Sequence, residues 1–106
     1  MTMKIGLMRE RVTIQAPVDQ QNPFGEATVE WQDVGEVWAS VAGVSVRDYF
    51  AGQQSGVIVT HRIFIRAFAG LTHQHRLVWR DRELQITSIL ERENRTIYEI
   101  LAREDP

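Results

Sequence analysis

The sequence contains no cysteine among its 106 residues. This absence excludes a disulfide framework and thiolate chemistry, and it fits a reducing compartment. The chain also lacks any apolar run approaching eighteen residues, so we expect no membrane span. Its first residues, MTMKIGLMRERV, contain neither a long apolar stretch nor a small-residue cleavage site, which argues against a signal peptide.

A strong net charge is missing as well. The 12 basic and 14 acidic residues leave a formal net charge of −2 at pH 7. There is therefore no global electrostatic argument for binding to nucleic acid or to an anionic membrane.

What is present is an ordinary globular composition, with 43% hydrophobic and 25% charged residues. The length predicts a single domain over residues 1–106. A chain of this size buries roughly 65% of the surface that its unfolded form exposes, so its core is thin. Residues 1–8 show no hydrophobic period and are expected to form a flexible N-terminal arm.

Alternation of apolar and polar residues predicts short β-strands along the chain. The first strand starts at Arg9, and Pro17 lies near its end. The turn sequence NPFGE then leads into a second stretch over residues 28–41, whose pattern breaks at Gly35 as at a β-bulge or a bend. Together these stretches predict a long, bent hairpin.

The clearest alternation covers residues 57–67, and two hairpins follow it, with turns predicted at Asp81–Arg82 and at Glu93–Arg95. A helix over residues 84–103 is the alternative, but the β-branched and aromatic residues there favour strands. Six short strands without a repeat close most easily as a small barrel or a sandwich. The predicted core consists of the inward-facing residues Val12, Ile14, Val29, Val37, Val41, Ile63, Ile65, Leu77, Leu84, Ile86 and Ile100.

One segment, VRDYFAGQQSG at residues 46–56, breaks the strand pattern. Ser45 can act as a helix N-cap, and Asp48 stands three residues later, as in a capping box. Gly52 or Gly56 can end the helix. We therefore predict a short helix over about residues 46–54, which is marginal in water without a surface to pack on.

Residues that could carry chemistry do not form a functional pattern. His73 and His75 lie two positions apart, but a stable metal site needs three or four ligands, so a solvated loop is favoured. None of the serines lies in a nucleophile elbow, and no glycine-rich phosphate loop is present. We expect no catalytic residue, no metal and no cofactor.

A basic face on one strand is a possible interface. Arg62 and Arg66 flank Phe64, and small barrels bind single-stranded nucleic acid with aromatics set among basic residues. Glutamates on nearby strands offset this charge, and an exposed face of ion pairs is the favoured interpretation.

Several short motifs follow one another in a characteristic order. They are LMRERVTIQAP at residues 7–17, the NPFGE turn, VWASV at residues 37–41, the RDYFAGQQ segment and VTHRIFIR. In this combination they resemble the phage head–tail joining proteins, also called head–tail adaptors or head-closure (stopper) proteins. The resemblance covers about residues 5–103; no motif is specific alone, whereas the combination is.

The resemblance implies a mainly β fold, a small barrel with one short helix and a long inter-strand loop, and no enzymatic activity. It further implies a ring beneath the portal or adaptor protein of a DNA-filled head, which completes the connector and offers a docking surface to a tail completion or terminator protein. Packaged DNA would pass near the channel. The expected location is the virion, with the bacterial host cytoplasm during assembly, and the isolated chain is expected to be monomeric.

In such proteins the segment between the second and third strands faces the ring channel or a neighbouring subunit. The resemblance carries this role to Val46, Arg47, Asp48, Tyr49, Phe50, Gly52, Gln53, Gln54 and Gly56. The two glycines depart from a more helix-forming run, so we expect a mobile loop after Gln54 that becomes ordered on assembly. Fixing the backbone costs about 1–2 kcal/mol per residue, which the packing of Tyr49 and Phe50 would have to offset.

A second function remains open on the residues alone, namely a free-standing barrel that binds single-stranded nucleic acid or a small ligand. A salt-dependent affinity for oligonucleotides would favour this alternative. A genomic neighbourhood of portal and tail genes would favour the connector component.

Overall fold

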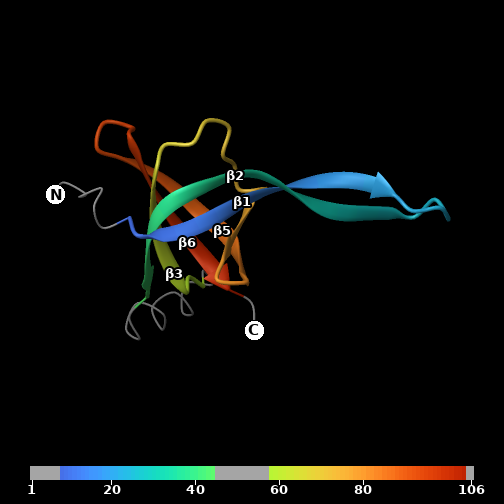
Figure 1. The fold of residues 1–106 in the computed structure, drawn as a ribbon, viewed down its shortest axis with the longest axis horizontal. Coiled ribbons are helices and arrows are strands. Elements are labelled where there is room, and N and C mark those ends of the chain that lie inside the picture. Colours follow the sequence, from blue (N-terminus) through green and yellow to red (C-terminus); the bar gives the residue numbers. More distant parts are fainter. Residues whose placement is uncertain (1–7, 45–57, 105–106) are drawn as a thin grey trace.

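The computed structural model describes residues 8–44 and 58–104. These residues form six β-strands, shown in Figure 1: β1 Glu10–Gln21, β2 Ala27–Gly43, β3 His61–Arg66, β4 Arg76–Trp79, β5 Arg82–Arg92 and β6 Ile97–Glu104. All pairings are antiparallel, and the strands close into a barrel in the order β1-β2-β3-β6-β5-β4. The predicted six-stranded, mainly β fold is confirmed, as a barrel rather than a sandwich. The helix predicted over residues 46–54 and the loop around it lie outside the described residues.

Several strand boundaries differ from the sequence prediction. β1 continues four residues beyond Pro17, in a region where β2 is its sole neighbour. Proline has no backbone N–H to donate, and it is tolerated here because one edge of β1 is unpaired. β3 begins at His61 rather than at residue 57. The β4–β5 turn consists of Arg80 and Asp81, both with positive φ, instead of Asp81 and Arg82. The turn predicted at Glu93–Arg95 is confirmed, and these three residues also have positive φ.

The β-bulge predicted near Gly35 is confirmed. The β1–β2 register shifts between Ile14 and Gln15, which face Gly35 and Asp33 respectively. The bulge lies where the hairpin bends away from the barrel. A Cβ added to Gly35 would lie 2.8 Å from Cε2 of Phe68. The Phe68 ring therefore leaves no room for a side chain at position 35.

The core lies inside the barrel and is built from alternate residues of every strand. Ten side chains form it: Val12, Ile14, Ala39, Ile63, Ile65, Leu77, Leu84, Ile86, Ile100 and Ala102. Val37 and Val41 pack against this cluster but are partly exposed. The prediction of Val29 as a core residue is wrong, because Val29 lies beyond the barrel and its exposed fraction is 56%.

Met8, which the sequence placed in the flexible N-terminal arm, is buried at 6% exposure. That boundary is therefore wrong at its last residue, while residues 1–7 are outside the described part of the chain. Within the described residues, no helix has the length and apolar character needed to cross a membrane.

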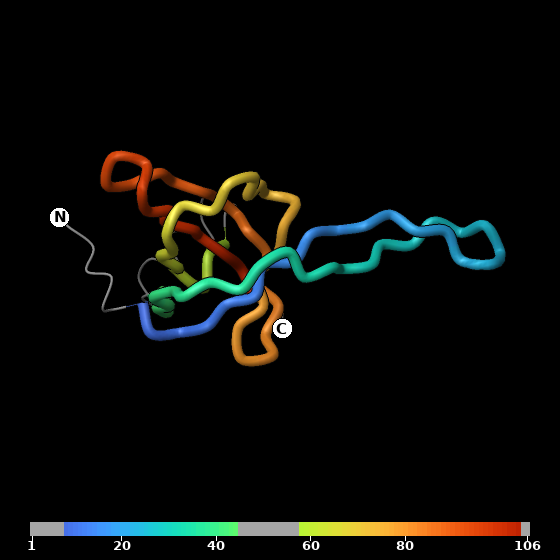
Figure 2. The backbone as a smooth tube through the Cα atoms, turned by 45° about the horizontal axis from the view of Figure 1, so that its top comes forward, coloured from blue at the N-terminus to red at the C-terminus, as the bar shows by residue number. Residues whose placement is uncertain are grey.

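The β1–β2 hairpin extends far beyond the barrel. We call residues 16–33 the arm; its two strands pair with each other and with no other strand. Figures 1 and 2 show the arm projecting from one end of the barrel, while β1 begins at the opposite end. The projection accounts for the elongated shape, with extents of 52 × 32 × 24 Å.

Candidate interaction surfaces

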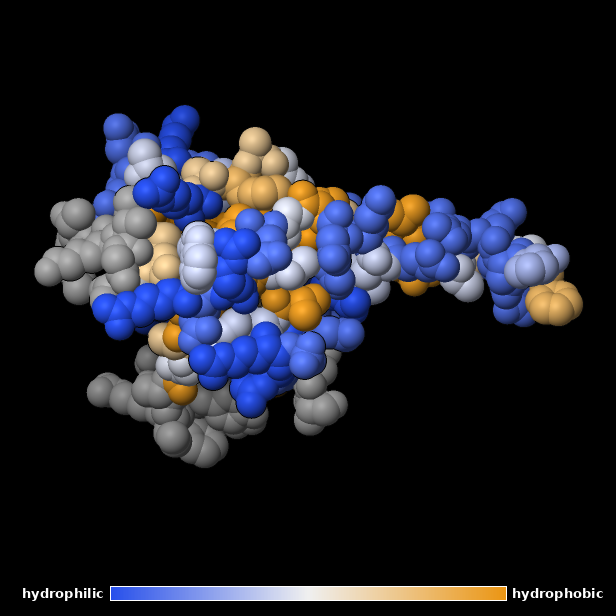
Figure 3. All heavy atoms as spheres, in the orientation of Figure 1, coloured by the Kyte–Doolittle hydropathy of each residue, from blue (hydrophilic) through white to orange (hydrophobic). Residues whose placement is uncertain are grey.

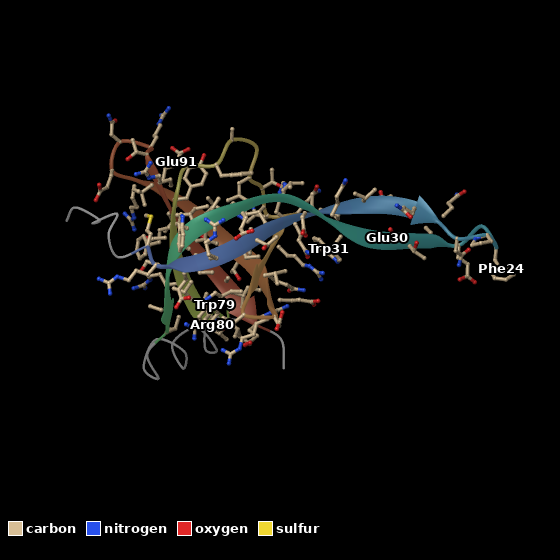
Figure 4. The ribbon with its side chains drawn as sticks, in the orientation of Figure 1. Phe24, Glu30, Trp31, Trp79, Arg80 and Glu91 are labelled. Carbon is tan, nitrogen blue, oxygen red and sulfur yellow. The ribbon has the colours of Figure 1, made fainter. Side chains whose placement is uncertain are left out.

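The tip of the arm is a hydrogen-bonded turn that presents an aromatic ring. The side-chain oxygen of Asn22 accepts hydrogen bonds from the backbone N–H groups of Phe24 and Glu26, at 3.0 and 2.9 Å. Gly25, with φ of 81°, takes the left-handed position of the turn. Phe24 is left 89% exposed at the extreme end of the molecule (Figure 4).

The arm also carries apolar side chains along one face. Trp31 lies opposite Pro17 and Val29 lies opposite Asp19, so these four residues share one side of the two-stranded ribbon. Figure 3 shows hydrophobic atoms at the tip and near the base of the arm among hydrophilic ones. Exposed aromatic and aliphatic residues gathered on a projecting element are typical of a protein–protein contact.

The charge of the arm has one sign. It contains Asp19, Glu26, Glu30 and Asp33 and no Lys, Arg or His. Since the whole chain has 12 basic and 14 acidic residues, the rest of the molecule carries a small excess of basic residues. The arm is therefore an acidic extension of a weakly basic body.

The base of the arm is fixed to the barrel by a polar network around Arg76. The Arg76 guanidinium stacks on Trp31, with its carbon 4.2 Å from the ring centroid. Its Nε donates to Oε1 of Gln15 at 2.7 Å, and its Nη1 lies 3.2 Å from a carboxylate oxygen of Glu83. Gln15 in turn donates to Asp33 at 2.7 Å. These contacts hold the arm in one direction relative to β4 and β5.

A cleft lies at the other end of the barrel, near the start of β1. Its volume is about 630 Å³, and its described lining consists of Met8, Arg9, Glu36, Val37, Trp38 and Arg66. Trp38 is 54% exposed, and Arg11 stacks on its ring at 4.5 Å. Glu36 is paired with Arg11 at 2.6 Å, whereas Arg66 has no ion-pair partner among the described residues.

The ends of the predicted interaction segment are held at one place in the barrel. Val44 donates its backbone N–H to the carbonyl of Thr60 at 3.0 Å, which joins the end of β2 to the residue before β3. The Thr60 hydroxyl accepts from the N–H of Glu104, and the Thr60 N–H donates to Ala102. Residues 45–57, which include all nine predicted segment residues from Val46 to Gly56, lie outside the described chain.

The predicted basic face on β3 is partly neutralised. Arg62 lies 3.3 Å from Oε1 of Glu99, and Arg92 contacts Oε2 of the same carboxylate at 2.9 Å. Glu99 is buried, with 8% of its surface exposed, so the two arginines offset the desolvation cost of its carboxylate. Arg62, Phe64 and Arg66 alternate along β3 and so share its outer face, where Phe64 is half-buried and Arg66 lines the cleft.

The histidines take separate positions. His61 makes an edge contact with Trp79, with the ring centroids 5.7 Å apart, and His75 bonds to Thr72 in the loop after β3. In residues 8–44 and 58–104, no group of three His, Cys, Asp or Glu residues is arranged to hold a metal ion.

Reasoning from the sequence did predict the bent hairpin, but it missed the arm as a surface. One signal was available: the stretch from residue 16 to residue 33 carries four acidic residues and no basic ones.

The described residues form a small closed barrel from which one hairpin projects. Residues 3–105 match the family described as phage head completion protein, and the chain belongs to this family. Membership assigns it a structural role in completing a phage head and confirms the resemblance drawn from the sequence motifs.

Two solved structures are similar over nearly the whole chain. The solution structure of protein SF1141 from Shigella flexneri 2a is 33% identical, covers 96% of each chain and has a TM-score of 0.76. A chain in the virion of a native gene transfer agent particle is 21% identical, covers 91% of this chain and 93% of that one, and has a TM-score of 0.61. The second likeness shows a shared fold. A search of curated proteins gives no match.

Proposed function

We propose that this protein is a structural virion component that assembles as a homo-oligomeric ring below the portal or adaptor protein. The ring completes the connector, closes the DNA-filled head and offers the attachment surface for the tail. The observation that carries this proposal is the family match over residues 3–105. The shared fold with a chain of a gene transfer agent virion supports it.

The partners on this proposal are the portal or adaptor on the head side and a tail completion or terminator protein on the tail side. Tyr49, Phe50 and the rest of residues 46–56 are proposed to face the channel or a neighbouring subunit. The bond between Val44 and Thr60 supports this role, because it makes that segment enter and leave the barrel at a single place. The protein acts without catalysis, in the virion and, during assembly, in the host cytoplasm.

The experiment is deletion of the gene in the phage or prophage that encodes it, followed by electron microscopy of the particles. We expect DNA-filled heads that leak DNA and lack tails, and restoration by the wild-type protein in trans. Images of complemented particles should show a ring of this protein between portal and tail. Normal tailed particles in the deletion strain would contradict the proposal.

The alternative, binding of single-stranded nucleic acid, has less support. On β3, Arg62 is ion-paired with Glu99. Arg66 is then the remaining cation of the basic face predicted on this strand. Oligonucleotide titration at two salt concentrations discriminates the two functions, because phosphate binding weakens steeply with salt. Tight, salt-sensitive binding by the free protein would favour the alternative.

A further inference from the structure

We propose that the arm of one copy of this chain docks into the cleft of a second copy, with Phe24 entering between Met8, Val37 and Trp38. This inference rests on the proposed ring and names the interface that closes it. The occupant of the cleft is therefore a second copy of the same chain.

Geometry is the first argument. The arm leaves one end of the barrel, and the cleft residues Met8 and Arg9 precede β1 at the other end (Figure 1). One molecule thus presents two different, complementary surfaces at opposite ends. A head-to-tail contact of this kind produces a closed ring when its rotation closes.

Shape and polarity are the second argument. Phe24 is 89% exposed on a turn braced by Asn22, and it gains little from remaining in water. The cleft volume of about 630 Å³ lies within the range of about 300–1,000 Å³ typical of pockets that hold small organic molecules, so it admits a phenyl ring. Trp38 and Val37 supply apolar walls, and a buried aromatic anchor is the usual centre of an interface.

Charge is the third argument. The arm brings four carboxylates and no cation. The cleft lining contains two arginines, Arg9 and Arg66, and one acid, Glu36, so its formal charge is positive. An acidic arm and a basic lining attract each other and also keep two arms, or two clefts, from pairing with themselves.

Rigidity is the fourth argument. The network around Arg76 sets the direction of the arm before any contact forms. A preorganised element loses less conformational freedom on binding. Docking then needs no rearrangement of the barrel.

The absence of cysteine from the native chain makes a site-directed cross-linking test direct. The double variant Gln21→Cys/Ala67→Cys places one thiol near the arm tip and one next to Arg66, and it preserves Phe24 and all four arm carboxylates. Complemented particles are treated with a short bismaleimide and analysed under denaturing conditions. We expect a ladder of covalent oligomers, and none from Gln21→Cys/His73→Cys, whose second thiol lies on the loop between β3 and β4.

The outcomes separate the inference from the proposed function. A ring visible in the particles without a ladder overturns the arm–cleft contact and leaves the ring standing. Cross-links from the arm to a different protein also overturn it. Particles with no ring of this protein overturn the proposed ring and the inference together.

A second variant gives an independent readout. Phe24→Ser should keep the melting temperature of the isolated protein but lower its incorporation into particles at least tenfold. Leu90→Ser is the matched control, because Leu90 is also an exposed large hydrophobic residue but lies on β5, outside the arm and the cleft lining. Equal incorporation of the two variants would contradict the inference.

Discussion

The guanidinium of Arg76 stacks on the indole of Trp31, 4.2 Å from its centroid, and so joins β4 to a strand of the arm. We predict that Arg76→Ala leaves the barrel folded and lowers the free energy of unfolding by about 1–3 kcal/mol, because the cation–π contact with Trp31 and the hydrogen bond to Gln15 are lost together. The arm should lose its fixed direction, which NMR relaxation of residues 16–33 would detect. Arg82→Ala is the control, since Arg82 stacks on Trp79 instead. Unchanged arm relaxation in Arg76→Ala would refute this role.

Ile63 tests which side of the sheet is the core. It is fully buried at the centre of β3, so Ile63→Ala should lower the unfolding free energy by about 2–5 kcal/mol in urea denaturation. Val29→Ala, at an exposed position of the arm, should change it by less than about 0.5 kcal/mol. Similar losses in both variants would mean that the arm is packed in solution.

Gly35 tests the close approach at the bulge. A Cβ there would meet the Phe68 ring at 2.8 and 2.9 Å, so Gly35→Ala should destabilise the fold by about 1–3 kcal/mol through overpacking. Gly43→Ala is the matched control in the same strand, because no atom lies within 4 Å of its added Cβ. Thermal unfolding of the two variants gives the comparison, and equal melting temperatures would be inconsistent with the contact.

Substitution of Tyr49 and Phe50 tests the role of residues 46–56 in assembly. Because we assign them to an assembly contact, Tyr49→Ser/Phe50→Ser should leave the melting temperature nearly unchanged while the yield of infectious particles falls. The measurements are thermal unfolding of the purified protein and titres of complemented phage. A large loss of melting temperature would instead assign the two aromatics to the fold.

The free protein should be mainly monomeric. A ring that closed spontaneously would prevent ordered addition to the head, so each arm–cleft contact must be weak until the connector aligns many copies. Light scattering at micromolar concentration should report a mass near 12.2 kDa. A stable dodecamer without any partner would contradict hierarchical assembly.

The parts of the fold that depend on local alternation were predictable from the sequence. The core positions of β3, Ile63 and Ile65, follow from period-two patterning, and the turn at residues 93–95 follows from its turn residues. The prediction that Val29 belongs to the core was wrong because Val29 follows the same alternation as the core residues. Alternation alone does not show whether a strand is part of the barrel. Val29 lies on the arm, where β1 and β2 pair only with each other, so no barrel interior covers its side chain.

The candidate surfaces were less predictable because they depend on contacts between residues distant in sequence. Trp31 and Arg76 meet only because β1 closes the barrel against β4, a pairing that no local pattern reveals. The cleft likewise combines residues just before β1 with Trp38 of β2 and Arg66 of β3. The charge of the arm, in contrast, is visible in the sequence.

The closure of the barrel determines how the molecule bears force. β1 serves both as a barrel strand and as one side of the arm, and it is joined to β4 through three residue pairs, Thr13–Val78, Ile14–Leu77 and Gln15–Arg76. A pull on the arm tip acts along β1 and therefore loads these three pairs together in shear, rather than opening them one after another. Tension carried through the arm would reach this seam before the longer β5–β6 ladder. The last pair of this seam includes Arg76, the arginine that also contacts Trp31 of the arm.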